Sequence, residues 1–216
     1  RQFAEGELAR RPELQDAARG RHSAYYLALL QILEPDWHTD RQLETLATIA
    51  RESDNMASAW DHALATGAWQ DLAGAMDSWG QYHLWQGLFT DGKTFCAGLE
   101  SRLKIEIGAA AASSLAHTTL WAKALAWQGL FLSATEEALA KLEESLAFLE
   151  RQDSDVRQMR RLKAFVLRAM AWRLIPIDSQ QAHQCAVQAL QLSLSLDNGW
   201  QVAESHYYLG LLNWKL

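Results

Sequence analysis

The stretch Trp85 to Thr94 reads W-Q-G-L-F-T-D-G-K-T, and the fold of the whole chain depends on its interpretation. From Gly87 onward it matches G-x-x-x-x-G-K-[ST], the pattern of phosphate-binding P-loops. Its first part, W-Q-G-L-F, occurs again from Trp127 to Phe131, where no G-K-T follows. A repeated pentapeptide indicates an internal repeat, which has to be examined before any motif.

Small residues recur at a nearly constant spacing along the chain. Gly87 and Gly129 are 42 residues apart, Ala169 follows after 40 and Gly210 after another 41. Each lies in an apolar, aromatic-rich segment of helical period, where a small residue lets two helices approach closely. Because this spacing is typical of solenoids made of helix pairs, the sequence predicts an all-α solenoid of antiparallel helix pairs.

A P-loop requires a strand before it and a helix after it. The segment before Gly87, L-A-G-A-M-D-S-W-G-Q-Y-H-L-W, has neither the alternation nor the β-branched residues of a strand. Leu88 and Phe89 are bulky where a phosphate loop uses small residues. We therefore interpret the match as a turn between two helices. A nucleotide site at 87–94, with Lys93 on phosphate, remains the alternative.

The composition is that of a helical globular chain. Of the 216 residues, 49% are hydrophobic and 21% are charged, which is ample for a buried core. The net charge of −6 gives no electrostatic footprint for nucleic acid. The uncharged segment 107–122 is too short and too weakly apolar to cross a membrane. Cys96 and Cys185 do not form a disulfide framework, so we expect buried free thiols in a cytoplasmic protein.

Helical period, caps and breakers divide the chain into helices. Pro35 ends the first helix, Thr39 or Asp40 caps the second, Ser53-Asp54-Asn55 interrupts it, and Gly67 ends it. Gly108 is expected to end a later helix. Apart from this second helix, the expected helices are 13–33, 69–89, 93–107, 113–132, 136–150, 156–174, 180–196 and 200–216.

Three segments carry a resemblance to a known family. They are R-Q-F-A-E-G-E-L from Arg1, R-H-S-A-Y-Y-L from Arg21 and E-S-D-N-M-A-S-A-W from Glu52. Together they resemble the region after the winged helix in bacterial STAND regulators, the signal-transduction ATPases with numerous domains. The later helix pairs, notably E-E-A-L-A-K-L-E-E-S-L-A-F-L from Glu136, are similar to the tetratricopeptide (TPR) repeats of those proteins.

The resemblance implies a junction segment, residues 1–67, followed by TPR-like repeats in 68–216, the last of them incomplete. It also implies that these repeats form a TPR-like α-solenoid, a right-handed superhelix of antiparallel helix pairs. It implies upstream NTPase and winged-helix domains, and we expect the chain to be a monomeric piece of that longer protein. The repeats of such proteins act as a sensor or autoinhibitory module. For this chain we expect a non-catalytic sensor module without a cofactor. We expect a peptide, protein or small-molecule ligand in the concave groove. A purely structural scaffold is a further alternative.

The first helix of each predicted pair carries the candidate ligand-binding residues. The repeats align Lys123 with Lys163, and Gln86 and Gln128 with Arg168, so that a polar column crosses neighbouring helices. These helices also hold tryptophans, either as spacers or as a groove lining, among them Trp79, Trp85, Trp121, Trp127, Trp172 and Trp214. The residues expected to contact a ligand are Tyr82, Trp85, Gln86, Lys123, Gln128, Lys163 and Arg168.

The expected helix 156–174 is distinctly basic. Its cations are Arg157, Arg160, Arg161, Lys163, Arg168 and Arg173. They form either a solvated face that pairs with the acidic helix 136–150, or a positive strip on the concave wall that receives an acidic peptide or a carboxylate.

Patterns typical of catalysis or metal binding do not occur in the sequence. No two histidines have the i, i+4 spacing that favours zinc ligation, and no H-E-x-x-H is present. No serine or cysteine lies in a nucleophile elbow. The sequence thus predicts neither an enzyme nor a metal site.

Overall fold

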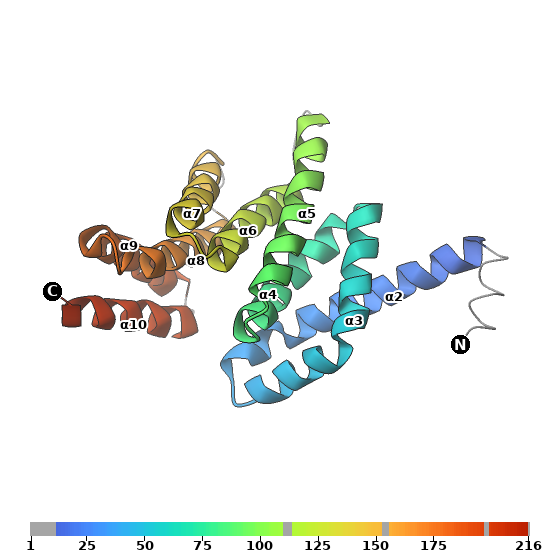
Figure 1. Cartoon of the computed structure of the whole chain (residues 1–216), viewed down its shortest axis with the longest axis horizontal. Helices are drawn as coiled ribbons and strands as arrows, with labels where there is room; N and C mark the ends of the chain where they lie inside the picture. The colour runs from blue at the N-terminus through green and yellow to red at the C-terminus, as the bar shows by residue number, and fades with distance from the viewer. Residues whose placement is uncertain (1–11, 110–113, 153–155, 197–198, 216) are drawn as a thin grey trace. The chain divides into compact units, whose positions relative to one another are not determined.

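The computed structural model describes residues 12–109, 114–152, 156–196 and 199–215, and every regular element in these ranges is a helix. The predicted all-α class is confirmed. The described residues belong to two compact units, Arg1–Tyr82 and His83–Leu216. The predicted division into residues 1–67 and 68–216 stays a prediction. The elements are α2 (Pro12–Leu33), the 3-10 helix η1 (Glu34–His38), α3 (Gln42–Thr66), α4 (Trp69–Trp85), α5 (Phe89–Ala109), α6 (Leu115–Phe131), α7 (Thr135–Glu150), α8 (Arg157–Leu174), α9 (Ser179–Ser195) and α10 (Gly199–Lys215) (Figure 1).

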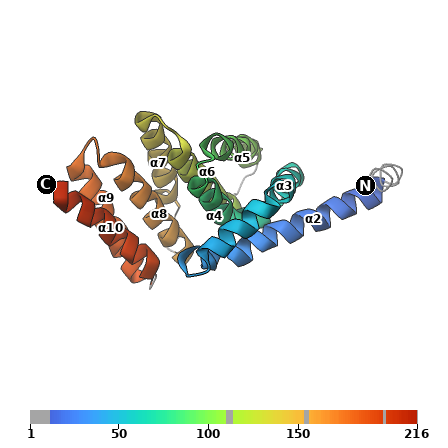
Figure 2. The same cartoon turned by 60° about the horizontal axis from the view of Figure 1, so that its bottom comes forward.

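The first unit is built on α2 and α3, which lie side by side and are joined through η1 (Figure 2). Apolar residues at helical spacing face one another in this pair, and Leu27, Leu30, Met56 and Trp60 are almost fully buried. Burying one such side chain stabilises the fold by about 1.5–3 kcal/mol. Packing of these stripes therefore holds the two helices together.

Two polar bridges add to the α2–α3 contact. The buried hydroxyl of Ser23 donates to the carbonyl of Ala59 at 2.8 Å. The hydroxyl of Tyr26 donates to Glu52 at 3.1 Å, and the Asn55 amide donates to the same carboxylate oxygen at 2.9 Å. The bridges satisfy polar groups that the packing would otherwise leave without partners.

The predicted break at Ser53-Asp54-Asn55 is wrong, because α3 runs without interruption from Gln42 to Thr66. The side chains that should cap a new helix bond within the existing one: Ser53 donates to the carbonyl of Ala50, and Asn55 donates to Glu52. Buried Ile49 and Met56, on either side of the segment, pack in the core. Tertiary packing therefore overrides the weak helix propensity of these three residues. The end at Gly67, with a left-handed φ of 74°, is as predicted.

The second unit contains α5 to α10, in which each helix contacts the next along the chain. The starts of α6, α8 and α10, at residues 115, 157 and 199, are 42 residues apart in each step. In addition, α8 contacts both α6 and α10 directly. The helices α6, α8 and α10 are therefore equivalent members of successive helix pairs, and each packs against the next of them. This arrangement is consistent with a helical repeat.

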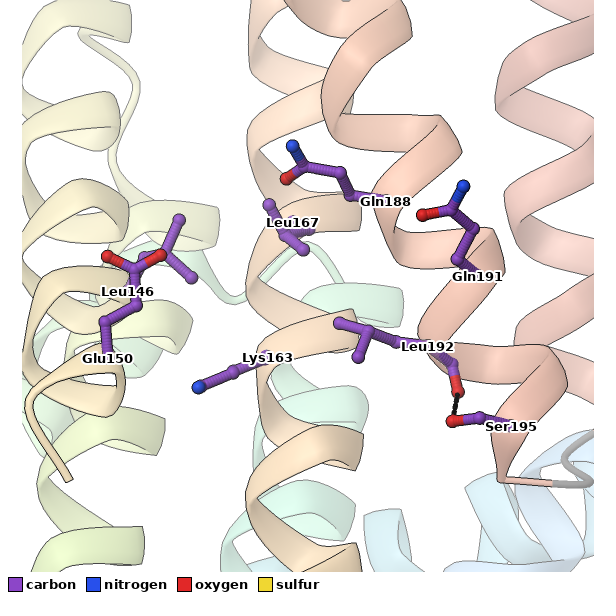
Figure 3. A pocket seen from close by; sticks show the side chains of 8 residues that line it. All are labelled: Leu146, Glu150, Lys163, Leu167, Gln188, Gln191, Leu192 and Ser195. Carbon is purple, nitrogen blue, oxygen red and sulfur yellow. Dashed lines mark hydrogen bonds between the residues drawn. The ribbon is translucent and has the colours of Figure 1, made fainter. Parts of the chain in front are cut away.

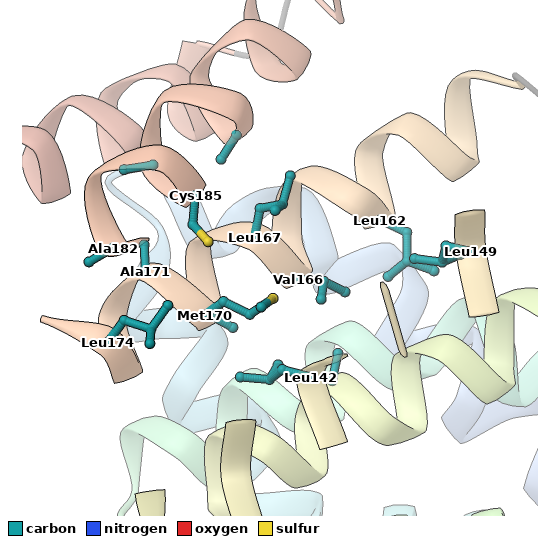
Figure 4. Close-up of a cluster of buried hydrophobic side chains, with 14 of the residues drawn as sticks. Leu142, Leu149, Leu162, Val166, Leu167, Met170, Ala171, Leu174, Ala182 and Cys185 are labelled. Carbon is teal, nitrogen blue, oxygen red and sulfur yellow. The ribbon is translucent and has the colours of Figure 1, made fainter. Parts of the chain in front are cut away.

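The core of this unit is an apolar cluster between α6, α7, α8 and α9 (Figure 4). Leu142 and Leu149 of α7 pack with Val166 and Met170 of α8, and all four are at least 95% buried. Small residues from α9, among them Cys185, close the other side of α8. Alternation of large and small side chains lets neighbouring helices interdigitate at high density.

The recurring small residues do not all have the predicted role. Gly129 does lie at a close approach, because a Cβ there would be 2.6 Å from Cγ of Leu142 and 3.0 Å from the carbonyl oxygen of Ala138. Gly87, however, lies in the turn after α4, and a Cβ at Gly210 would meet nothing within 4 Å. Counting 42 residues from Gly129 leads to Ala171, which is fully buried, and not to Ala169.

Both cysteines are buried free thiols, as predicted. Trp127 is 2% exposed and serves the helix packing, whereas Trp172 is 48% exposed. A groove lined by tryptophan stays a prediction. Within the described ranges, no helix has the length and apolar character needed to cross a membrane.

Candidate ligand-binding site

The stretch 85–94 forms a helix end followed by a new helix. A helix, α4, precedes it, and Gly87 has a φ of 69°. The N–H of Gly87 donates to the carbonyl of Leu84 at 3.3 Å, and the N–H of Leu88 donates to that of His83 at 2.9 Å. This pair of bonds is typical of a helix closed by a left-handed glycine. The predicted turn between two helices is confirmed, but it covers only residues 86–88, because α4 ends before the predicted residue 89 and α5 begins before the predicted residue 93.

The G-K-T residues belong to α5. The N–H of Gly92 donates to the carbonyl of Leu88 at 2.9 Å, and the Thr94 hydroxyl donates to that of Thr90 at 2.9 Å. A Cβ at Gly92 would lie 2.7 Å from the ring of Phe131, so glycine here allows α5 and α6 to pack closely. The segment lacks the loop that cradles a phosphate, and it gives no support to the nucleotide-binding alternative.

On α6, Lys123 and Gln128 are buried, at 8% and 4% exposure. The whole helix is enclosed, because almost every residue from Thr118 to Phe131 is buried. A helix that is buried on all sides presents little surface to a ligand. The role of Lys123 and Gln128 in ligand contact stays a prediction, but both side chains lie inside the helix packing.

Gln128 belongs to a polar network around Glu100 of α5. The carboxylate of Glu100 accepts from Lys141 of α7 at 2.9 Å and pairs with Lys104 at 2.7 Å. Burial raises the pKa of Glu100, but hydrogen bonds from Lys104, Lys141 and Gln128 outweigh it and bring the pKa below its ordinary value. The network ties α5, α6 and α7 together as a structural device.

Arg168 lies on the side of α8 that faces α10 and is 5% exposed. Its Nε is 2.9 Å from Oε2 of Glu204, while its buried Nη1 has no hydrogen-bond partner among the described residues. The Glu204 carboxylate also accepts from Tyr208 at 3.5 Å. Burial lowers the pKa of Arg168 and Glu204 opposes this effect, so the pair holds the two helices together through charge.

Lys163 points to a different side of α8. Five residues separate it from Arg168, which places the two about 140° apart around the helix axis. Lys163 is half-buried and lines a pocket with residues of α7 and α9. Lys163 and Arg168 therefore lie on different sides of α8, although the sequence placed them on one wall, and their role in ligand contact stays a prediction.

The three remaining candidates lie near the end of α4. Tyr82 belongs to the first unit, is 6% exposed and stacks on Trp79 with ring centroids 5.5 Å apart. Trp85 and Gln86 belong to the second unit, where Trp85 is 39% exposed and Gln86 is exposed. Tyr82 thus serves the packing of its own unit.

The basic residues of α8 do not form one strip. Arg157 donates to the carbonyl of Leu196 at 2.8 Å, and Arg173 contacts the carbonyls of Gly129, Leu130 and Leu132 at 2.7–2.9 Å. These two arginines and Arg168 have their partners on or beside α6, α9 and α10. The cations are distributed around α8, and these three bind it to its neighbours.

Aromatic residues on α8 and α10 form a partly exposed cluster that the predicted set misses. Trp172 and Tyr207 are 48% and 59% exposed. Both contact Tyr208, with ring centroids 6.1 Å and 5.6 Å away. The exposed Arg161 lies on the same face of α8 as Arg168 and Trp172, because residues four and seven positions apart share one side of a helix. The 42-residue spacing aligns Trp172 with Trp214 and not with Tyr207 or Tyr208, so alignment of the repeats does not locate this cluster.

No group of three or more metal-ligating side chains lies together in the part of the chain that the structure describes. A comparison of the chain with protein-family models, with curated proteins and with solved structures found no match.

Proposed function

We propose that the chain is a non-catalytic, TPR-like interaction module that acts as the sensor region of a STAND-type signalling NTPase. It binds a peptide, protein or small ligand and transmits the binding to NTPase and winged-helix domains upstream. The sequence resemblance supports the assignment to this class. The 42-residue spacing of α6, α8 and α10 supports a repeat that extends into a right-handed superhelix.

One observation carries the binding role: α8 lies between α6 and α10, and the wall they form displays the aromatic cluster of Trp172, Tyr207 and Tyr208. Partly exposed aromatic side chains beside charged groups are enriched at binding surfaces, because they bury large areas at a small cost in side-chain entropy. The exposed Arg161 adds a positive charge to the α8 side of this wall, whereas the charge of buried Arg168 is compensated by Glu204. The surface favours a peptide segment with an apolar or aromatic side chain next to a carboxylate.

Selection of random peptides displayed on phage against the purified chain tests this proposal. We expect enriched peptides whose binding falls at least about tenfold with Trp172→Ala or Tyr207→Ala, since contacts of aromatic anchors contribute about 2 kcal/mol or more. Tyr25→Ala is a matched control, because Tyr25 is 63% exposed on α2 in the other unit. Selection of no peptide, or equal loss in the control, contradicts the proposal. Intrinsic ATP hydrolysis by the purified chain contradicts the non-catalytic role.

A further inference from the structure

A pocket of about 410 Å³ lies on the side of α8 that faces α7 and α9 (Figure 3). This volume is in the range of about 300–1,000 Å³ that is common for small-ligand sites. The pocket lies within the second unit, and α8 forms its floor between α7 and α9. Its lining residues are Leu146, Glu150, Lys163, Leu167, Gln188, Gln191, Leu192 and Ser195.

Leucines from all three helices form the apolar part of the lining. Leu146 comes from α7, Leu167 from α8 and Leu192 from α9 (Figure 3). Leu167 is 5% exposed and belongs to the core cluster, whereas Leu146 and Leu192 are half-buried at its edge. An apolar ligand group placed here would extend the core outward and remove further leucine surface from water.

The polar part of the lining combines one cation, one anion and two amides. Lys163 and Glu150 lie at the same end of the pocket, and Gln188 and Gln191 project from α9 (Figure 3). None of these four side chains makes a hydrogen bond or an ion pair with another described residue. Their hydrogen-bonding capacity is therefore available to a ligand.

We propose that this pocket binds short apolar peptides in their zwitterionic form. The ammonium of Lys163 pairs with the ligand carboxylate, and the Glu150 carboxylate pairs with the ligand ammonium. The apolar side chains lie on Leu146, Leu167 and Leu192. Gln188 and Gln191 bond to the peptide amides, since a glutamine amide both donates and accepts. A cation and an anion beside an apolar floor match a dipeptide and disfavour ligands of a single charge.

This site is separate from the aromatic wall. Lys163 lies about 140° from Arg168 around α8, so the pocket and the wall occupy different sides of one helix. Binding at one site does not require the other, and the two proposals fail or hold independently.

Calorimetric titration of the full chain with the dipeptide Leu-Leu tests the pocket. We expect saturable binding that Lys163→Gln and Glu150→Gln each weaken about fivefold, as expected for one solvent-accessible ion pair. The matched controls are Lys93→Gln on α5 and Glu143→Gln on α7, both exposed. They should bind like the unaltered chain, and so should Trp172→Ala, which separates this site from the proposed function.

Blocked dipeptides assign each charge. Leu-Leu amide has no carboxylate, so Lys163→Gln should bind this ligand as tightly as the unaltered chain does. Glu150→Gln should be without effect on N-acetyl-Leu-Leu, which has no ammonium. Glu150 is exposed, so its substitution leaves the fold intact even if a change at half-buried Lys163 does not. Absence of saturable binding at about 10 mM Leu-Leu, or equal weakening by the controls, overturns the proposal.

Discussion

The guanidinium Nη2 of Arg173 on α8 lies 2.7 Å from the carbonyl oxygen of Leu132, the residue that ends α6. The same nitrogen contacts the carbonyls of Gly129 and Leu130. The last carbonyls of a helix have no partner within it, and a cation placed there also interacts favourably with the helix dipole. An arginine far along the chain thus completes the end of an earlier helix.

Arg173→Met should therefore destabilise the chain by about 1–3 kcal/mol, since hydrogen bonds from a charged donor to buried carbonyls are lost. Chemical denaturation followed by circular dichroism measures the change. Arg151→Met is the control, because Arg151 is exposed at the end of α7 and should change stability by less than about 0.5 kcal/mol. Equal effects in the two variants would show that the contact with α6 has no energetic weight.

Gly129→Ala should destabilise the chain by about 1–2 kcal/mol, although alanine is the better helix former. The new Cβ would lie 2.6 Å from Leu142 Cγ and 3.0 Å from a backbone oxygen, so α6 and α7 would have to separate. Gly210→Ala offers the opposite case, because its surroundings are open and it should gain up to about 1 kcal/mol. Thermal unfolding of both variants should give midpoint shifts of opposite sign.

The Glu100 network should make stability depend on pH. The pKa of Glu100 is lower in the folded than in the unfolded chain, so the folded state stabilises the ionised form of this carboxylate. Its contribution is complete above the unfolded pKa of about 4.3 and is lost as the pH falls through the lowered folded value. Glu100→Gln should remove this dependence and lower stability near pH 7 by about 1–2 kcal/mol. Denaturation between about pH 7 and pH 3 measures both effects, and parallel curves for the two proteins would contradict the assignment.

The Arg168–Glu204 pair should respond differently to single and double substitution. Glu204→Gln leaves a buried guanidinium without its counter-charge and should cost about 1–3 kcal/mol, less than for a fully buried pair because Glu204 is 32% exposed. Arg168→Met with Glu204→Met removes both charges and should cost less than Glu204→Gln alone. A double-mutant cycle in denaturant measures the coupling, and strictly additive effects would mean that the two charges do not interact.

Sequence periodicity predicted most helices of the second unit to within two residues. It was wrong at Gly87, because the expected helix 69–89 runs through this glycine, whereas α4 ends at Trp85 and α5 begins at Phe89. It failed at Ser53-Asp54-Asn55, where local capping preference competes with the burial of Ile49 and Met56 in the α2–α3 contact. Burial is a tertiary property that propensities do not contain.

The candidate site was harder to predict than the fold. Alignment of the repeats placed Lys163 and Arg168 in one polar column, but the side on which a residue lies depends on the rotation of its helix. That rotation is fixed by packing, here by the contact of α8 with α10 on one side and with α7 and α9 on the other. Likewise, nothing in the composition of α6 distinguishes Gln128 in a buried network from Gln128 at a surface.

Two buried serine hydroxyls determine how far one helix can slide along another. Ser23 donates to Ala59 between α2 and α3, and Ser145 donates to Ala122 at 2.8 Å between α7 and α6. Apolar stripes alone tolerate a displacement by one residue, about 1.5 Å, because leucine and alanine pack in many ways. Such a displacement would leave a buried hydroxyl without its hydrogen-bond partner, which costs about 1–3 kcal/mol. Each hydroxyl therefore selects one axial register of its helix pair. Side-chain shape alone would permit several registers.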